Sequence, residues 1–337
     1  MKAIAYQQPL PIEHPDALQD IALTRPNPRG HDLLVEVKAV SVNPVDTKIR
    51  RGTSPSAGEW KVLGWDAAGV VVEVGEGVRN FKPGDRVWYA GSISRQGTNA
   101  EFHLVDEGIV GHMPKSLDFA RAAALPLTAI TAWEMLFDRL AIAPGKQPTQ
   151  DALLVVGAAG GVGSILVQLA RRLTSLRVIG TASRPDTAEW VRELGAQDVI
   201  DHRQPLSLEL KRIGVSSVKY AVSLNQTKSH FAEIVESLGP QGKFGLIDDP
   251  DALDIMMLKR KSISLHWEFM FTRSLFETAD MAGQGRLLDE LAGLVDAGLV
   301  RTTVAEHFGQ INSDNLKRAH ALLESGRSRG KVVLEGF

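Results

Sequence analysis

A run of glycines after a short apolar segment is the part of this sequence that most directly predicts chemistry. Residues 153–156, Leu-Leu-Val-Val, have the composition of a buried strand, and a segment with apolar residues at helical spacing follows the glycines. A strand, a glycine loop and a helix in this order are typical of a dinucleotide site, because backbone N–H groups and the helix N-terminus can reach a pyrophosphate. The expected cofactor contacts in the loop are Ala159, Gly160, Gly161, Val162 and Gly163.

Two other interpretations of the glycine loop stay open at this point. A tight turn that packs a helix onto a sheet also needs glycine, and Ala158 replaces the first glycine of the usual G-x-G-x-x-G pattern. A methyltransferase that uses an adenosyl cofactor would also have a glycine loop after its first strand.

The end of the second predicted strand distinguishes these possibilities. An NAD site has a carboxylate about 20 residues after the loop, which accepts a hydrogen bond from the ribose 2′-hydroxyl. This chain has Ser183 and Arg184 at that place. A hydroxyl and a guanidinium suit a 2′-phosphate, so the sequence predicts NADPH and disfavours both NAD and adenosyl methionine. A solvated surface arginine is the alternative for Arg184.

Two kinds of secondary structure must position these residues. Between residues 33 and 106, short apolar or alternating runs are separated by Gly and Pro turns, which predicts a mostly antiparallel, barrel-like β domain. After Pro114 come Ala-rich helices, with one expected at 130–140, and then strands that alternate with helices. That alternation predicts a parallel sheet covered on both faces, and hence an α/β fold. The expected strands are 153–156, 177–181, 198–200, 220–223 and 243–247.

Composition and charge exclude several other functions. The 337 residues include 38 Lys and Arg against 40 Asp and Glu, so a formal charge of −2 gives no field that would attract nucleic acid. The absence of Cys excludes disulfides, thiolate nucleophiles and cysteine metal sites, and fits a cytoplasmic protein. Residues 152–170 are uncharged, but four glycines divide them, so we expect no membrane span. Polar residues and Pro9 follow the N-terminus before an apolar core can build up, so we expect no export signal.

Five segments of the chain resemble the zinc-free quinone oxidoreductases of the medium-chain dehydrogenase/reductase superfamily. They are Ser41–Thr47, Gly64–Gly69, Lys82–Val87, Ala123–Thr128 and the glycine loop. The resemblance implies a GroES-like β-barrel catalytic domain formed by residues 1–126 and 270–337, with a Rossmann domain at 127–269 inserted into it. It also implies a homodimer that transfers hydride from NADPH to a quinone or an α,β-unsaturated carbonyl compound bound in the cleft between the domains.

The same resemblance assigns catalytic residues. Asn43 and Thr131 would line the nicotinamide end of the site, and the Asn43 amide, held extended by Pro44, would donate to the oxygen that develops negative charge. For Asp46 we prefer support of the local backbone to proton transfer. Lys48 stands where relatives often have Tyr, and either donates a proton or is simply solvated.

Further cofactor contacts are expected by position. They are His202 near the 2′-phosphate, with Arg203 adding charge, Asn225 after the strand at 220–223, Phe269 and Met270 in a strand, and Lys331 in the final segment. Where zinc-dependent relatives have metal ligands, this chain has Asn43, Trp65 or Asp66, and Leu127, so we expect no metal.

Two alternative functions remain open from the sequence. One is a zinc-free alcohol or aldehyde dehydrogenase. The other is a non-catalytic NADPH-binding protein similar to the lens crystallins that also bind RNA, although the near-neutral charge disfavours nucleic acid as the main partner. The cluster Trp267, Phe269 and Phe271 is interpreted as core or dimer interface rather than substrate pocket.

Overall fold

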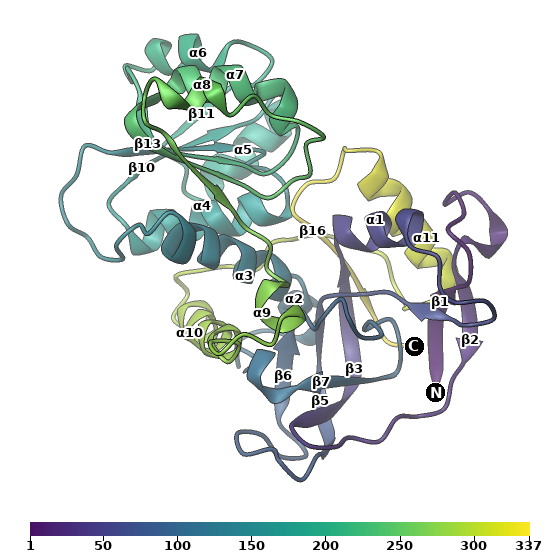
Figure 1. Ribbon diagram of the computed structural model, residues 1–337. Coiled ribbons are helices and arrows are strands. Elements are labelled where there is room, and N and C mark those ends of the chain that lie inside the picture. Colours follow the sequence, from purple (N-terminus) through teal and green to yellow (C-terminus); the bar gives the residue numbers. More distant parts are fainter. The chain divides into compact units, whose positions relative to one another are not determined.

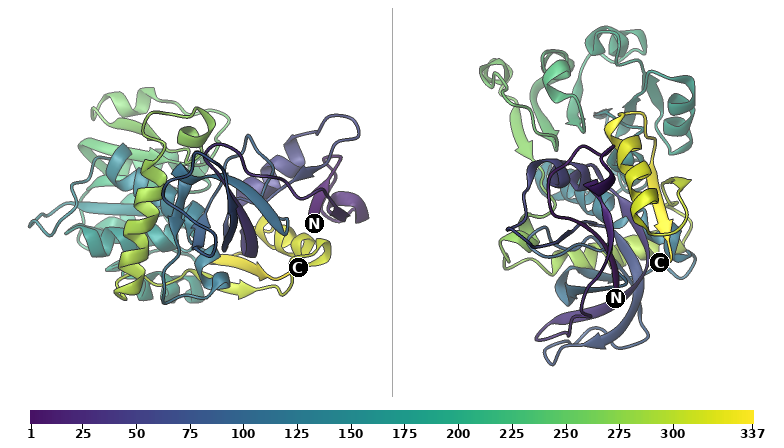
Figure 2. Two further views of the ribbon diagram at one scale, coloured as in Figure 1. Left: turned by 90° about the horizontal axis from the view of Figure 1, so that it is seen from below. Right: turned by 90° about the vertical axis from the view of Figure 1, so that its right-hand side faces the viewer.

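The computed structural model describes residues 1–337, which divide into two compact units. Unit 1 comprises Met1–Ile130 and Phe271–Phe337, and unit 2 comprises Thr131–Met270. Unit 2 is therefore one continuous segment inserted into unit 1. Both ends of the chain belong to unit 1, as the labels in Figure 2 show.

Unit 1 is mainly antiparallel β structure, as the sequence predicted. Its larger sheet has the order β15-β16-β3-β5-β6-β8, with β7 also paired to β3, and only the β15–β16 pair is parallel. A smaller antiparallel sheet has the order β2-β1-β4. The strands are β1 (Lys2–Tyr6), β2 (Gln19–Ala22), β3 (Asp32–Val42), β4 (Lys61–Val62), β5 (Ala67–Val74), β6 (Arg86–Tyr89), β7 (Phe102–Asp106), β8 (Val110–His112), β15 (Val304–His307) and β16 (Lys331–Glu335).

Helix α1 (Pro44–Gly52) is the helix of unit 1 that matters most for the site. Asn43 precedes it in an extended conformation, and Pro44 begins it, a position where the missing N–H of proline costs nothing. The fully buried Arg50 bonds to His320 and Glu324 of α11 (Ser313–Glu324), which ties the two helices together. The other helices of unit 1 are α2 (Phe119–Ala123), α9 (Thr272–Leu275), α10 (Gly283–Asp296) and two 3-10 turns, Pro15–Ala17 and Glu107–Ile109, while α3 (Pro126–Trp133) crosses the boundary between the units.

Unit 2 is a doubly wound parallel sheet, which confirms the predicted α/β class. The order of its strands is β11-β10-β9-β12-β13-β14, which is 3-2-1-4-5-6 when the strands are numbered along this unit. This order is that of dinucleotide-binding domains, in which the ligand lies beyond the carboxyl ends of the strands where the order reverses. The strands are β9 (Ala152–Val156), β10 (Arg177–Thr181), β11 (Asp198–Ile200), β12 (Val218–Ser223), β13 (Leu238–Leu246) and β14 (Ser264–Trp267).

Helices cover both faces of this sheet because its strands are apolar on both sides. Figure 1 shows α4 (Gly161–Leu173) and α5 (Pro185–Glu193) on one side, and α6 (Leu206–Arg212), α7 (Thr227–Ser237) and α8 (Met256–Lys259) on the other. The second group buries Leu206, Leu210, Phe231 and Ile234 against the strands. None of the helices combines the length and apolarity needed to cross a membrane.

Two local predictions were wrong. The helix expected at 130–140 changes after Trp133 into a π-helical segment, Glu134–Arg139, a rare form that is frequent at functional sites. The strand expected to contain Phe269 and Met270 ends at Trp267, so both residues lie beyond it. The preceding Glu268 is buried in an ionic contact with Arg139, which holds this segment to the π-helical segment.

Candidate functional site

The glycine loop connects β9 to α4 at the carboxyl edge of the unit 2 sheet. Gly157 has φ +85°, a conformation that favours glycine. A Cβ atom at Gly163 would lie 2.5 Å from the Gly157 carbonyl oxygen, so only glycine lets α4 begin this close to the strand. The residues between them, Ala159 to Val162, are half-exposed. The loop therefore offers its backbone and the start of a 13-residue helix to a ligand, as a dinucleotide pyrophosphate requires.

The end of β10 carries the predicted 2′-phosphate residues. Ser183 is half-buried and Arg184 is exposed as the residue before α5. The Arg184 guanidinium lies 3.4 Å from Asp186, and both side chains are about half exposed, so the pair is held weakly. No carboxylate occupies positions 181–184, where a ribose hydroxyl would find its acceptor in an NAD site.

Two histidines meet at the neighbouring strand ends. His202 follows β11 and contacts His230 of α7, with 5.8 Å between the ring centroids. Burial lowers the pKa of both imidazoles, and the positive charges of Arg184 and Arg203 further lower that of His202. Arg203 itself forms an ion pair with Asp201 at 2.7 Å. Sequence reasoning missed His230, because it lies 28 residues after His202 on a different element and belongs to no motif.

The structure brings one of the remaining predicted cofactor residues to the loop. The Asn225 side chain packs on Gly157, where an added Cβ would lie 2.7 Å from Asn225 Oδ1. Thr131 and Met270 are buried, at the first and last positions of unit 2. Phe269 is 47% exposed. The contacts of these three residues with a cofactor stay predictions.

A buried pair of carboxyl groups connects the segment that follows Thr131 to the segment that precedes Met270. Glu134 and Glu268 have fully buried side chains next to each other, and both lie against the Arg139 guanidinium, at 3.5 and 2.7 Å. Burial and the neighbouring Glu134 raise the pKa of Glu268 to about 9. Two carboxyl groups can hydrogen-bond only if one keeps its proton, so at neutral pH the pair carries one negative charge opposite Arg139.

In unit 1, the buried Asn43 amide is fully engaged inside the protein. Its Nδ2 donates to Asp66 Oδ2 at 2.8 Å and lies 3.3 Å from the Trp65 carbonyl, while its Oδ1 accepts from Lys331. A flipped amide would place oxygen against carboxylate and N–H against ammonium, so the network fixes its orientation. In this geometry the amide connects Asp66 to Lys331, and the expected role of Asn43 as a donor to substrate stays a prediction.

Asp66 and Lys331 form a buried ion pair at 3.1 Å. Burial raises the pKa of Asp66 and lowers that of Lys331, and each charge opposes the shift of the other. Asp66 also accepts the backbone N–H of Leu127 at 2.8 Å, so every neighbour that hydrogen-bonds to it is a donor and the ionised form fits. The Lys331 ammonium is thus bonded inside unit 1, and its expected contact with the cofactor stays a prediction.

Asp46 and Lys48 lie on α1 and differ in environment. The Asp46 carboxylate accepts the backbone N–H groups of Asn43 at 2.6 Å and Gly64 at 2.9 Å, which agrees with backbone support rather than proton transfer. Burial raises the pKa of Asp46 to about 7, against these hydrogen bonds and the charge of Lys331. Lys48 is exposed.

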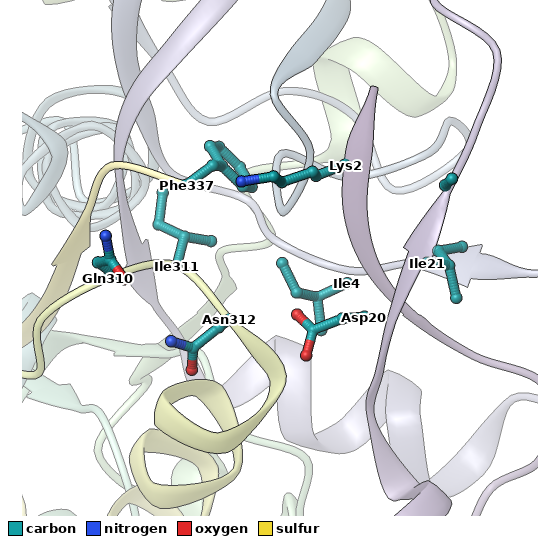
Figure 3. A pocket seen from close by; sticks show the side chains of 9 residues that line it. Lys2, Ile4, Asp20, Ile21, Gln310, Ile311, Asn312 and Phe337 are labelled. Atoms are coloured by element: carbon teal, nitrogen blue, oxygen red, sulfur yellow. The ribbon is translucent and has the colours of Figure 1, made fainter.

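One hollow of about 460 Å³ lies elsewhere in unit 1 (Figure 3). Its polar lining comes from Lys2, Asp20, Gln310 and Asn312, with Ile311 and Phe337 beside them. Asp20 is used structurally, since it accepts from both the backbone and the hydroxyl of Ser313 at the start of α11. None of the predicted site residues lines this hollow.

Two family models match the chain. Residues 29–115 match the alcohol dehydrogenase GroES-like domain, which confirms the predicted fold of the first part of unit 1. Residues 194–334 match the model described as zinc-binding dehydrogenase.

The residues of this chain do not fit the zinc that the second description names. Zinc takes thiolate, imidazole or carboxylate ligands, usually three or four of them. At the positions where zinc-dependent relatives have metal ligands, this chain has the Asn43 amide, Asp66 and the apolar Leu127. Lys331 already bonds to the side-chain oxygens of Asn43 and Asp66. The structure contains no group of three His, Cys, Asp or Glu residues that could hold a metal ion.

Known proteins of similar sequence and structure agree on the family. The chain is 36% identical over 338 residues to a zinc-type alcohol dehydrogenase-like protein of Staphylococcus epidermidis, covering 99% of each chain. A crystal structure described as a candidate zinc-dependent alcohol dehydrogenase of Rhizobium etli is 58% identical, with a TM-score of 0.97 and coverage of 100% and 98%. Escherichia coli quinone oxidoreductase complexed with NADPH is 27% identical, with a TM-score of 0.84 and coverage of 99% and 100%. The chain therefore belongs to the zinc-type alcohol dehydrogenase-like family of the medium-chain dehydrogenase/reductase superfamily, and it is an oxidoreductase.

Proposed function

We propose that this oxidoreductase transfers hydride from NADPH to a quinone or an α,β-unsaturated carbonyl compound, without zinc. The observation that carries the proposal is the end of β10, where Ser183 and Arg184 stand in place of a carboxylate beside a dinucleotide loop. The similarity to a quinone oxidoreductase that was crystallised with NADPH supports it.

The site proposed for the 2′-phosphate combines side chains that follow the neighbouring strands β10 and β11 with one from α7. Ser183 and Arg184 follow β10, His202 follows β11, and His230 lies on the helix after β12. A phosphate monoester offers three acceptor oxygens and a charge near −2, so it matches one hydroxyl, one guanidinium and two imidazoles. Asp186 does not block the site, because an exposed ion pair 3.4 Å long is readily exchanged for a phosphate.

The residues around the acceptor would have separate tasks. Bound NADPH supplies the hydride. Since the Asn43 amide is engaged with Asp66 and Lys331, we assign donation to the acceptor oxygen to the exposed Lys48, whose ammonium can hydrogen-bond or release a proton. Phe269 and Met270 would contact the carboxamide through their backbone, held in place by the neighbouring Glu268.

Cofactor titrations test the phosphate site. NADPH should bind about tenfold or more tightly than NADH, because a charge-assisted hydrogen bond contributes roughly 1.5–3 kcal/mol and exposure weakens it. Arg184→Ala should reduce the preference without changing the affinity for NADH. His230→Gln should reduce it most at acidic pH, below the ordinary imidazole range, because burial lowers the pKa of His230. Arg192→Ala is the matched control, because it removes the same charge from the other end of α5.

Two outcomes would contradict this assignment. Equal affinities of the wild-type protein for NADPH and NADH would refute the choice of cofactor. A preference that survives Arg184→Ala and is insensitive to salt would move the phosphate to His202 and Arg203, since the Arg184 contact is exposed and screened.

A substrate assay tests the reaction. Absorbance of NADPH should fall when an ortho-quinone or an enone is added, and prolonged chelation should leave the rate unchanged. The names of the Staphylococcus and Rhizobium proteins favour a second candidate, an alcohol dehydrogenase. Reduction of NADP⁺ by simple alcohols, faster than the reverse reaction with quinones, would select that function.

We also propose that the protein is a homodimer. β14 is an edge strand of the unit 2 sheet, and the neighbouring Trp267 and Phe269 are 54% and 47% exposed. Edge strands with apolar side chains are places where another chain adds to a sheet. Sedimentation velocity should give a dimer for the wild-type protein and a monomer for Trp267→Glu; a wild-type monomer at micromolar concentration would contradict the proposal.

A further inference from the structure

The Lys331 ammonium lies in a closed shell of oxygen atoms. The side chain is 3% exposed, and its three N–H bonds meet three acceptors: the Val42 carbonyl at 2.9 Å, the Asn43 amide oxygen, and the Asp66 carboxylate at 3.1 Å. The acceptors come from the end of β3 and from the segment before β5, while Lys331 begins β16. One cation thus joins three segments far apart in the sequence.

The surrounding groups require a positive charge at this point. Asp66 has no exposed surface, and Lys331 is the positively charged side chain that contacts it. Asp46, also buried, adds negative charge near Lys331. A buried carboxylate without a cation would have to take up a proton or lose its donors, including the Leu127 N–H that fixes the start of α3.

We propose that the Lys331 ammonium is the resident cation of this site and replaces the metal ion that the family's name implies. Carboxylate, amide and carbonyl oxygens are groups that also coordinate divalent cations. Here their lone pairs are directed at an ammonium that is part of the chain, and a divalent ion would be repelled by it. The segments at 42–43, 66 and 127 are therefore held by a cation that neither dissociates nor can be chelated.

Chemical rescue of a truncated lysine tests this assignment. Lys331→Ala should lower the melting temperature by on the order of 10 °C, because one partner of a buried ion pair is lost. Ethylammonium chloride should restore at least half of that loss in a saturable manner, whereas sodium chloride at equal ionic strength should not. Lys331→Met is the matched control, because it fills the space without a charge and should not respond to ethylammonium.

A double variant keeps the test decisive if Lys331→Ala does not fold. Lys331→Met/Asp66→Asn removes both charges of the buried pair, so it leaves no carboxylate at position 66 without its cation and should melt above Lys331→Met alone. If the lysine acts only by filling space, the second substitution lowers the melting temperature further and the proposal fails. It also fails if ethylammonium affects Lys331→Ala and Lys331→Met equally.

Metal binding provides an independent readout. After incubation with Zn²⁺ and desalting, the wild-type protein should retain far less than one zinc per chain. Stoichiometric zinc that is lost in Asp66→Asn would overturn the proposal. None of these measurements uses NADPH or a quinone, so a failed chemical rescue would leave the proposed hydride transfer untouched. Stoichiometric zinc would contradict only the statement that the transfer occurs without zinc.

Discussion

The buried pair Glu134 and Glu268 predicts an unusual loss of stability at alkaline pH. The pKa of Glu268 is about 9 in the folded protein and about 4.5 in an ordinary glutamate. Between these values the folded state keeps a proton that the unfolded state has released. The contribution of this proton to the free energy of unfolding is therefore fully present below pH 4.5. It falls as the pH rises, until Glu268 ionises near pH 9.

The size of this effect follows from the width of the pH interval between the two pKa values. Each pH unit within it lowers the free energy of unfolding by about 1.4 kcal/mol, so the wild-type protein should lose about 4 kcal/mol between pH 6 and pH 9 through this group. At about 2–4 °C per kcal/mol, the melting temperature should fall on the order of 10 °C.

Glu268→Gln is the perturbation that isolates the shared proton. Its amide N–H can donate to Glu134 as the protonated carboxyl does, and its oxygen can accept from Arg139 Nε. The variant should therefore melt like the wild-type protein near pH 5 and about 10 °C above it at pH 9. Circular dichroism melts between pH 5 and 9.5 would measure both profiles, with Glu189→Gln on the exposed face of α5 as the control. If the melting temperatures of the wild-type protein and Glu268→Gln change in parallel with pH, the shared proton is refuted.

Three further predictions concern the two predicted sites. Asn43→Ala should lower the melting temperature and the turnover together, because it unpairs Asp66 and Lys331; a loss of turnover at unchanged stability would return Asn43 to the role of donor. Gly163→Ala should destabilise unit 2 by about 1–3 kcal/mol, because the added Cβ overpacks against the backbone. At Gly160 the atom nearest to an added Cβ is 3.5 Å away, so Gly160→Ala should leave unfolding unchanged and weaken NADPH binding in fluorescence titrations. Lys48→Met should reduce kcat for quinone reduction tenfold or more with little change in NADPH affinity, and an unchanged kcat would remove Lys48 from the mechanism.

The parts of the fold that the sequence predicted correctly depend on local patterns. The strands and helices of unit 2 alternate with clear periodicity, and the packing role of Gly163 follows from its place between a strand and a helix. The turns rich in Gly and Pro likewise predicted the antiparallel strands of unit 1. Each of these signals lies within a few residues of the element it specifies.

What the sequence could not predict depends on contacts between distant residues. An asparagine before a helix looks like a free donor until Lys331, 288 residues later, is seen to hold its oxygen. The segment at 268–270 has the composition of a strand, but Glu268 is drawn to Arg139, 129 residues earlier, and the strand ends before it. The approach of His230 to His202 likewise depends on how α7 packs on the sheet. No local pattern encodes such contacts.

The position of Lys331 near the end of the chain has a consequence for biosynthesis. Unit 2 is continuous, so its whole sequence has been synthesised while the 67 residues of unit 1 at 271–337 are still to be made. Until residue 331 emerges, Asp66 has no cation, and β3 lacks β16 as its neighbour. The first domain to begin is thus the last to be completed, and during synthesis its unpaired β3 edge is where a chaperone would be needed.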